Sequence, residues 1–233
     1  MAKKLLSNRI LYEDNHLIIV NKLPSEIVQG DKTGDETLGD LVKNYIKEKY
    51  NKPRDVFLGV VHRIDRPVSG AVIFARTSKA LTRMNTMIKE RKLDKKYWAI
   101  VKTKPEAEER TLTHYLKKNQ AQNKSYVVDQ TTDGAKKAEL NYRFISSSDS
   151  FHLIEVELIT GRHHQIRAQL SAIGCHIKGD LKYGFPRSNK DGSISLHARS
   201  IEFAHPVKDE IIKVAAPVPK DDLWTYFENQ TDK

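Results

Sequence analysis

The chain carries the stretch His62-Arg63-Ile64-Asp65-Arg66-Pro67-Val68-Ser69-Gly70 between two short apolar runs, 57–61 and 71–75. The apolar runs predict strands, so the polar stretch between them is expected at or between strand ends. Because Pro67 cannot donate to a strand ladder, we expect the first strand to end near Asp65. Loops that follow strands commonly carry functional residues, which makes this stretch the first candidate for a site.

Asp65 is a carboxylate held among cations. If 61–66 is extended, Arg63 and Asp65 project to one side of the strand while His62 and Arg66 project to the other. Neighbouring cations favour the ionised carboxylate, which is then available as a nucleophile or a base. An ion-pair cluster on a solvated face is the alternative, and from spacing alone it is the commoner origin of such a pattern.

The composition indicates a protein that meets a polyanion. The 233 residues include 40 Lys and Arg against 30 Asp and Glu, a formal charge of +10, and such an excess of cations favours nucleic acid or an anionic surface as partner. No run approaches the roughly 18 apolar residues of a membrane span, and the first nine residues lack the apolar core of a secretory signal. Cys175 is the only cysteine, as is typical of a reducing compartment. We therefore expect a cytoplasmic protein that is not bound to a membrane.

Hydrophobic periodicity predicts one mixed α+β domain over 1–233, and we expect its sheet to be largely antiparallel and flanked by helices. We expect 1–9 to be a flexible N-terminus and the Lys-rich span 102–135 to be a polar insert made of a loop and a hairpin. Thr37 and Ser78 are expected to cap helices. The predicted strands are 10–12, 17–20, 57–61, 71–75, 97–101, 138–145, 151–159, 195–203 and 211–215. The predicted helices are 38–50, 79–92 and 162–174, and a Pro-rich tail follows the last strand.

A second group of polar residues lies in Thr160-Gly161-Arg162-His163-His164-Gln165-Ile166-Arg167. On a helix, His163 and Arg167 would share one face at i,i+4, and the arginine would point into a cleft. Two adjacent histidines with Cys175 and His176 also raise the possibility of zinc. However, adjacent helical side chains point about 100° apart, and no zinc-binding spacing is present. We expect these histidines to be structural or substrate-binding and predict no metal.

A third group, Lys95-Lys96-Tyr97-Trp98-Ala99-Ile100-Val101, joins cations to two aromatic residues at the start of a predicted strand. Tyr97 and Trp98 face opposite sides of that strand, so only one of them can line a given site. An aromatic ring can stack on an unpaired base, although local sequence alone favours a core position for both.

These segments together resemble the RluA-type pseudouridine synthases. The matching segments follow the order of the family and extend from about Tyr12 to Pro219. They are the Asp65 stretch 62–70, the Tyr97 strand 95–101, the Arg167 segment 160–167, the segment 174–184, and the closing pieces Leu196-His197-Ala198 and Phe203-Ala204-His205-Pro206.

The resemblance implies that the protein isomerises uridine in RNA to pseudouridine without cofactor or metal. Asp65 would be the catalytic nucleophile, attacking either the sugar C1′ or the base C6. Tyr97 would pack on the target base and assist removal of the C5 proton, and Arg167 would pair with the catalytic aspartate. Arg63 would help to take the target nucleotide out of the RNA stack, a base-flipping step that costs a few kcal/mol.

The remaining expectations concern the substrate. His62, Arg162, His163 and Gln165 are expected to contact RNA, which in this family is ribosomal or transfer RNA. We expect a monomer with no protein partner and no S4-type RNA-binding domain, so the insert 102–135 is one candidate for RNA selection and a plain solvated loop is the other. A catalytically silent RNA-binding or RNA-chaperone protein on the same fold is the alternative function. The sequence departs from the family at Ile64 and Val68, and it has Gln169 where histidine is common.

Overall fold

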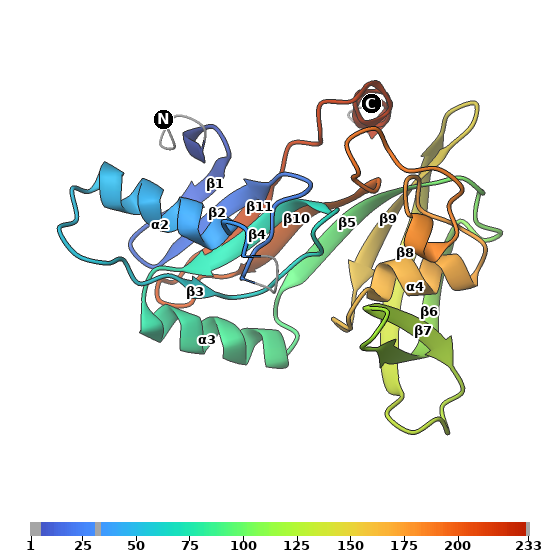
Figure 1. Ribbon diagram of the computed structural model, residues 1–233, viewed down its shortest axis with the longest axis horizontal. Coiled ribbons are helices and arrows are strands. Elements are labelled where there is room, and N and C mark those ends of the chain that lie inside the picture. The colour runs from blue at the N-terminus through green and yellow to red at the C-terminus, as the bar shows by residue number, and fades with distance from the viewer. Residues whose placement is uncertain (1–5, 31–33, 232–233) are drawn as a thin grey trace. The chain divides into compact units, whose positions relative to one another are not determined.

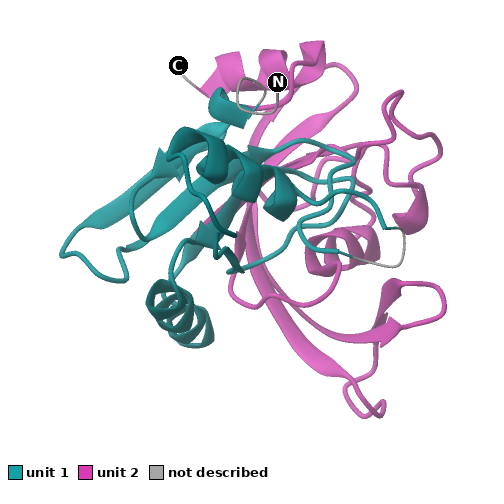
Figure 2. Cartoon of the chain, turned by 60° about the vertical axis from the view of Figure 1, so that its left-hand side comes forward, with its two compact units in different colours: residues 1–94, 198–217 teal, residues 95–197, 218–233 magenta. Residues whose placement is uncertain are grey.

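The computed structural model describes residues 6–30 and 34–231 of the chain (Figure 1). They belong to two compact units, which Figure 2 shows in different colours. Unit 1 comprises residues 1–94 and 198–217, and unit 2 comprises residues 95–197 and 218–233.

The predicted flexible segment 1–9 lies partly outside the described residues, which begin at residue 6. Within that segment, Leu6 is buried in the core of unit 1. Arg9 donates from both terminal nitrogens to the carboxylate of Glu26. The described part of this segment is therefore packed against the unit.

Unit 1 is built on a sheet with the strand order β1-β2-β4-β10, to which β3 adds beside β4 and β11 beside β10. The β1–β2, β2–β4, β3–β4 and β10–β11 pairs are antiparallel. The elements of unit 1 are β1 (Ile10–Glu13), β2 (Leu17–Lys22), α2 (Leu38–Lys49), β3 (Gly59–Val60), β4 (Ser69–Ala75), α3 (Ser78–Lys89), β10 (Leu196–Ala204, in this unit from Ala198) and β11 (Ile211–Ala215).

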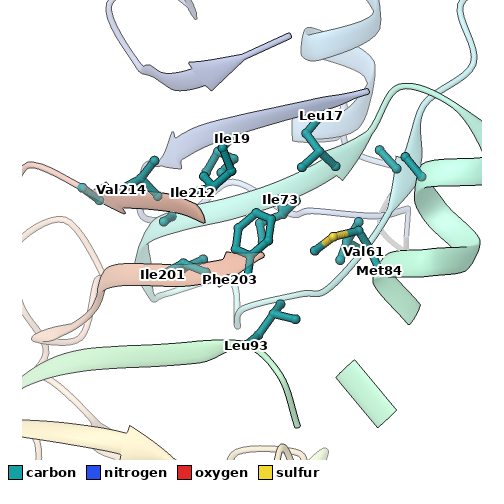
Figure 3. Close-up of a cluster of buried hydrophobic side chains, with 14 residues drawn as sticks. Leu17, Ile19, Val61, Ile73, Met84, Leu93, Ile201, Phe203, Ile212 and Val214 are labelled. Atoms are coloured by element: carbon teal, nitrogen blue, oxygen red, sulfur yellow. The ribbon is translucent and has the colours of Figure 1, made fainter. Parts of the chain in front are cut away.

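The strands β2 and β4 are buried on both faces, which explains their continuous apolar runs. Alternate side chains of a strand point to opposite faces. Leu17 and Ile73 accordingly pack in one cluster with Met84 of α3 (Figure 3). Ile18, the next residue of β2, packs instead with Val42 of α2. The two helices thus cover different faces of the sheet.

The two helix starts differ in how closely they follow the prediction. At α2, Thr37 and Asp40 form the predicted capping box, in which each side chain accepts a hydrogen bond from the other residue's backbone N–H. At α3, the cap is Thr77 and not Ser78, because the Thr77 hydroxyl accepts from the backbone N–H of Ala80. Helix α3 also ends at Lys89, three residues before its predicted end.

The prediction that an extended strand continues to Asp65 is wrong. Strand β3 covers only Gly59–Val60. Beyond it, the ring nitrogen Nε2 of His62 accepts the backbone N–H of Ile73 at 3.2 Å. A side chain thus takes the position that a strand carbonyl would occupy, and the chain leaves the ladder several residues before Pro67. The broader expectation is confirmed, since the Asp65 stretch lies between the end of β3 and the start of β4.

Unit 2 is built on an antiparallel sheet with the strand order β5-β9-β8-β6-β7. The predicted α+β class with antiparallel sheet and flanking helices is therefore confirmed. The elements of unit 2 are β5 (Asp94–Val101, in this unit from Lys95), β6 (Glu109–Asn119), β7 (Lys124–Val128), β8 (Lys136–Ser147), β9 (His152–Leu158), α4 (Gln165–Ala172), the 3₁₀ turn η1 (Leu181–Tyr183) and α5 (Asp222–Thr231).

The Lys-rich span 102–135 forms more of the sheet than was expected. It contains the predicted hairpin, formed by β6 and β7. Strand β6 also pairs with β8 over eight residues, from Glu109 opposite Arg143 to Leu116 opposite Lys136. Its polar composition reflects strands whose side chains alternate between a buried residue such as Leu112 and exposed lysines and threonines.

Helix α5 was missed by the sequence analysis, which treated the segment after β11 as a Pro-rich tail. Asp221 starts this helix by accepting the backbone N–H groups of Leu223 and Trp224. Trp224 and Phe227, three residues apart, bury one face of the helix against Trp98 of β5. An aspartate followed by aromatic residues at helical spacing was the sequence signal that could have predicted this helix. Across the described parts of the chain, no helix is long and apolar enough to span a membrane.

The turn into β4 demands a glycine at position 70. Gly70 pairs with Lys22 at the end of β2, and its φ of +116° lies in a region that other residues rarely adopt. A Cβ atom here would lie 2.4 Å from the backbone oxygen of Ala198 in β10. Both the backbone angle and the close approach of the neighbouring strand therefore exclude a side chain.

We predict that Gly70→Ala lowers the free energy of unfolding by about 3 kcal/mol or more, because strain and overpacking combine. The matched control is Gly34→Ala. Gly34 also has a positive φ, of +72°, but no described atom lies within 4 Å of the point that a Cβ atom would occupy, so we expect a loss of about 1 kcal/mol. Urea unfolding of the three proteins measures the difference. Equal losses would show that the approach of Ala198 is unimportant.

Candidate active site

The backbone of the Asp65 turn is held by hydrogen bonds to the carbonyl groups of Asp65 and Arg66. The Asp65 carbonyl accepts the backbone N–H of Val68 at 3.0 Å, which closes the turn. The Arg66 carbonyl accepts the backbone N–H of Ser25 at 2.9 Å and the ammonium of Lys22 at 3.0 Å. Asp65 is half-buried in this arrangement. Its carboxylate is therefore carried on a fixed turn and not on a free loop.

Lys22 is a fully buried lysine beneath this turn. Its Nζ atom donates to the carbonyl oxygens of Leu23, Glu26 and Arg66, at 2.8 to 3.0 Å. Burial lowers the pKa of this lysine to about 7, against the opposing effect of the Glu26 and Asp65 charges. The sequence analysis missed Lys22. A lone lysine at the end of an apolar strand was the only signal, and such a lysine is usually solvated.

The three cations predicted around Asp65 take different positions. Arg63 is exposed. His62 is half-buried, and its Nε2 is occupied by the Ile73 N–H. Arg66 lies across the outside of the turn, where it donates from Nε to the Ser25 carbonyl and forms an ion pair with Asp35. Arg66 therefore binds the turn to the segment that follows β2, a structural role that the sequence left unassigned.

In unit 2, Arg167 lies on α4 and is almost fully buried. It donates from Nε and Nη2 to the two carboxylate oxygens of Asp180, at 2.7 and 2.8 Å. The ring of Tyr183 lies 5.0 Å from its guanidinium carbon. A bidentate ion pair of this kind fixes the plane of the guanidinium as well as its position. The predicted pairing of Arg167 with Asp65 stays a prediction.

Tyr183 connects the Arg167 helix to the β6–β7 hairpin. Its hydroxyl donates to the Ser125 carbonyl at 3.0 Å and accepts the Ser125 N–H at 2.9 Å. The same hydroxyl lies 3.0 Å from Nδ1 of His164. Burial, with the Arg167 charge as the next cause, holds the pKa of His164 far below its ordinary value, so this histidine is neutral. Tyr183 therefore contacts Arg167, His164 and Ser125 at once. The sequence analysis assigned no role to this tyrosine.

His163 does not share a helix face with Arg167, and this prediction is wrong. Helix α4 begins at Gln165, after His164 has adopted a left-handed conformation with φ of 52°. His163 instead reaches the β6–β7 hairpin, where its ring nitrogens lie 2.9 Å from the Ser125 hydroxyl and 3.1 Å from the Asn123 side chain. Helix α4 begins after its predicted start because the residues before Gln165 form a turn that is held by side-chain hydrogen bonds.

Gln165 closes that turn. Its side-chain oxygen accepts from the Thr160 hydroxyl and the backbone N–H of Arg162, and its side-chain nitrogen donates to the Glu139 carbonyl. Gln165 is buried, whereas Arg162 is exposed and donates from Nε to the Lys137 carbonyl. Of these two predicted RNA contacts, the arginine is the one that faces solvent.

Tyr97 is buried on the face of the unit 2 sheet that α4 covers. Within β5, β9 and β8, Tyr97 lies opposite Val156, which lies opposite Tyr142. Alternation along β8 places Ala138 on the same face as Tyr142, and Ala138 packs against Ala168 of α4. Trp98 points to the other face and packs against α5, so the prediction that only one of the two aromatics can line a site is consistent with this geometry.

The zinc hypothesis finds no support in the residues that suggested it. The rings of His163 and His164 are stacked on each other and bonded to the groups described above. Cys175 is buried, and burial raises the pKa of its thiol to about 11, which disfavours the thiolate that metals bind.

Elsewhere in the described residues, Asp14, His205 and Glu210 bring possible metal ligands within 4.8 Å of one another. However, Nδ1 of His205 accepts two backbone N–H groups, so its Nε2 carries the proton, and that nitrogen faces Asp14 at 3.1 Å. Lys208 forms ion pairs with both carboxylates. This group is an ion-pair network.

Comparison with known proteins identifies the class. Residues 16–172 match the family model described as RNA pseudouridylate synthase. The chain is 33% identical over 236 residues to ribosomal large subunit pseudouridine synthase C of Buchnera aphidicola, covering 97% of this chain and 71% of that protein. It is 30% identical over 237 residues to an RNA pseudouridine synthase of Helicobacter pylori, covering 98% and 71%. The human RNA pseudouridylate synthase domain containing 4 has the same fold, with a TM-score of 0.79, 23% identity, and coverage of 99% of this chain and 95% of that one.

The chain belongs to the RNA pseudouridylate synthase family, and the predicted resemblance is confirmed. It is accordingly an RNA pseudouridine synthase, an isomerase that converts uridine in RNA to pseudouridine.

We predict that the unfolding free energy of the wild type increases relative to that of Lys22→Met as pH rises from about 7 toward 10. The pKa of Lys22 is lower in the folded chain than in the unfolded chain, so in this window the unfolded chain binds more protons and stability rises with pH, by at most about 1.4 kcal/mol per pH unit. Methionine has no such group. Urea unfolding at several pH values tests this, and a difference that stays constant with pH would show that the Lys22 ammonium titrates normally.

Proposed function

We propose that this enzyme uses Asp65 as the nucleophile that initiates uridine isomerisation in RNA. The observation that carries the proposal is the anchorage of the Asp65 turn by the buried ammonium of Lys22 and by the backbone N–H of Ser25. A nucleophile must be held at a defined position to reach one carbon of the substrate, and a backbone fixed by these two donors provides that. A carboxylate serving only as a surface ion-pair partner has no need of this support.

The reaction rearranges bonds without net loss or gain of atoms. The bond between N1 of the base and C1′ of the sugar breaks, and C5 of the base bonds to C1′. The C5 proton leaves and N1 gains a proton. We assign contact with the target base to Tyr97, as the resemblance implies, and electrostatic support of the site to Arg167. The bidentate ion pair between Arg167 and Asp180 supports the assignment of Arg167, because a cation that is already fixed needs no rearrangement during the reaction.

The RNA contacts are assigned by exposure. Arg63 and Arg162 are exposed residues, so we assign extrusion of the target nucleotide and phosphate contact to them. His62, His163 and Gln165 use their polar atoms within the protein, and we assign them the positioning of the loops that carry these arginines. The net charge of +10 supports a polyanionic substrate.

For the substrate itself, we propose ribosomal RNA of the large subunit as the first to examine and transfer RNA as the second. The name of the Buchnera aphidicola relative supports this order. We further propose that the whole chain works as one catalytic domain, as a monomer in the cytoplasm. A catalytically silent RNA-binding protein is the rival function.

We predict that cells lacking the gene lose pseudouridine at one or more positions in ribosomal or transfer RNA, and that the wild-type gene restores it. Asp65→Asn should not restore it, because an amide is a poor nucleophile. Asp55→Asn is the matched control, since Asp55 is an exposed carboxylate of the same unit, and it should restore modification fully. Pseudouridine mapping of total RNA is the measurement.

Two results would contradict the proposal. Full restoration by Asp65→Asn would show that Asp65 is not the nucleophile. A deletion that changes no pseudouridine under any growth condition, while the purified protein binds RNA, would favour the silent RNA-binding protein.

A further inference from the structure

Lys95 is a half-buried lysine of β5 that has no partner within the described chain. Its ammonium makes no hydrogen bond or ion pair with any described residue. Burial alone lowers its pKa, with no nearby carboxylate opposing that effect. Lys22 provides the contrast, because its ammonium is bonded to three carbonyl oxygens. Lys95 is thus partly removed from water and receives no compensating contact from the protein.

The position of Lys95 in β5 places it on the same face of the unit 2 sheet as Tyr97. Lys95 precedes Tyr97 by two residues in β5, so their side chains leave the same face of the sheet. That is the face covered by α4, the helix of Arg167. The ammonium of Lys95 and the ring of Tyr97 therefore belong to the sheet face that the Arg167 helix covers.

Lys96, the next residue, shows what an ordinary lysine does in this strand. It leaves the opposite face and approaches Glu155 of β9 at 3.8 Å. Its side chain is 41% exposed, as is typical of surface ion pairs that add little to stability. The two lysines are adjacent, have the same chemistry and belong to the same strand, but only Lys95 lacks an acceptor.

A partly desolvated ammonium without a partner lowers stability. An anion that bonds to it recovers part of that free energy, and the more so because water no longer competes fully for the charge. The substrate of this enzyme is a polyanion whose backbone supplies a phosphate at each nucleotide. A target base that stacks near Tyr97 brings its own and its neighbouring phosphates to the same region.

We propose that Lys95 binds one backbone phosphate of the RNA at or next to the target nucleotide, and so positions the base that Tyr97 contacts. The proposal rests on the proposed function, in which the Tyr97 face receives the target base. Lys95 acts through the position of the substrate and takes no part in the chemical step.

Binding of RNA by the inactive Asp65→Asn protein tests this, with a short single-stranded RNA of mixed sequence as the probe and salt concentration as the variable. Adding Lys95→Met should weaken binding about tenfold at low salt and reduce the slope of log K against log salt by about one unit. Lys95→Arg should retain most of the affinity. Lys96→Met, the matched control, should change the affinity and slope by much less.

Thermal unfolding separates this role from a structural one. Methionine keeps the apolar stem of the lysine and removes only the unpaired ammonium, so the melting temperature of Lys95→Met should equal or exceed that of its parent. A lower melting temperature with unchanged RNA affinity would overturn the proposal in favour of a structural lysine, as would equal effects of Lys95→Met and Lys96→Met on RNA affinity. If the Asp65→Asn parent shows no salt-dependent RNA binding, the proposed contacts of this enzyme with RNA phosphates fail together with the Lys95 assignment. If the parent binds and Lys95→Met binds equally well, only the Lys95 assignment fails.

Discussion

The buried ammonium of Lys22 is the contact on which the proposed site depends most. It ends β2, where its neighbour across the ladder is Gly70, and it reaches under the turn to the carbonyl of Arg66. One side chain therefore joins the end of β2, the residues that follow it and the Asp65 turn. Because a buried charge is tolerated only where its donors are satisfied, the backbone around it has little freedom. The position of Asp65 follows from that restriction.

A comparable arrangement supports Arg167 in unit 2. Asp180 accepts two hydrogen bonds from the guanidinium, and the Tyr183 ring lies beside it. The Tyr183 hydroxyl is fixed in turn by Ser125 of β7 and by the neutral His164. In both units a side chain proposed to meet the substrate is held by buried groups that do not meet it. The chemistry proposed for the enzyme needs such fixed charges, because reorganising them during the reaction would add to the barrier.

Much of the fold was predictable, because alternation and capping are local properties. The hairpin of β1 and β2, the capping box of Thr37, and the strands β10 and β11 follow from them. The failures arise where a side chain replaces a backbone partner. The ring of His62 ends the β3 ladder early, and the amide of Gln165 delays the start of α4. The supporting roles of Lys22, Asp180 and Tyr183 were not predicted for a related reason, since these roles depend on contacts that join distant parts of the sequence.

The assignment of Asp65 as the attacking group can be tested in a single reaction step, by release of tritium from RNA labelled at C5 of uridine, since that hydrogen leaves when C5 becomes bonded to the sugar. The RNA is taken from cells that lack the gene and is mixed with excess enzyme in a single turnover. We expect release by the wild type and none by Asp65→Asn, although the variant still binds the same RNA. Release by Asp65→Asn at the wild-type rate would show that another group attacks the uridine.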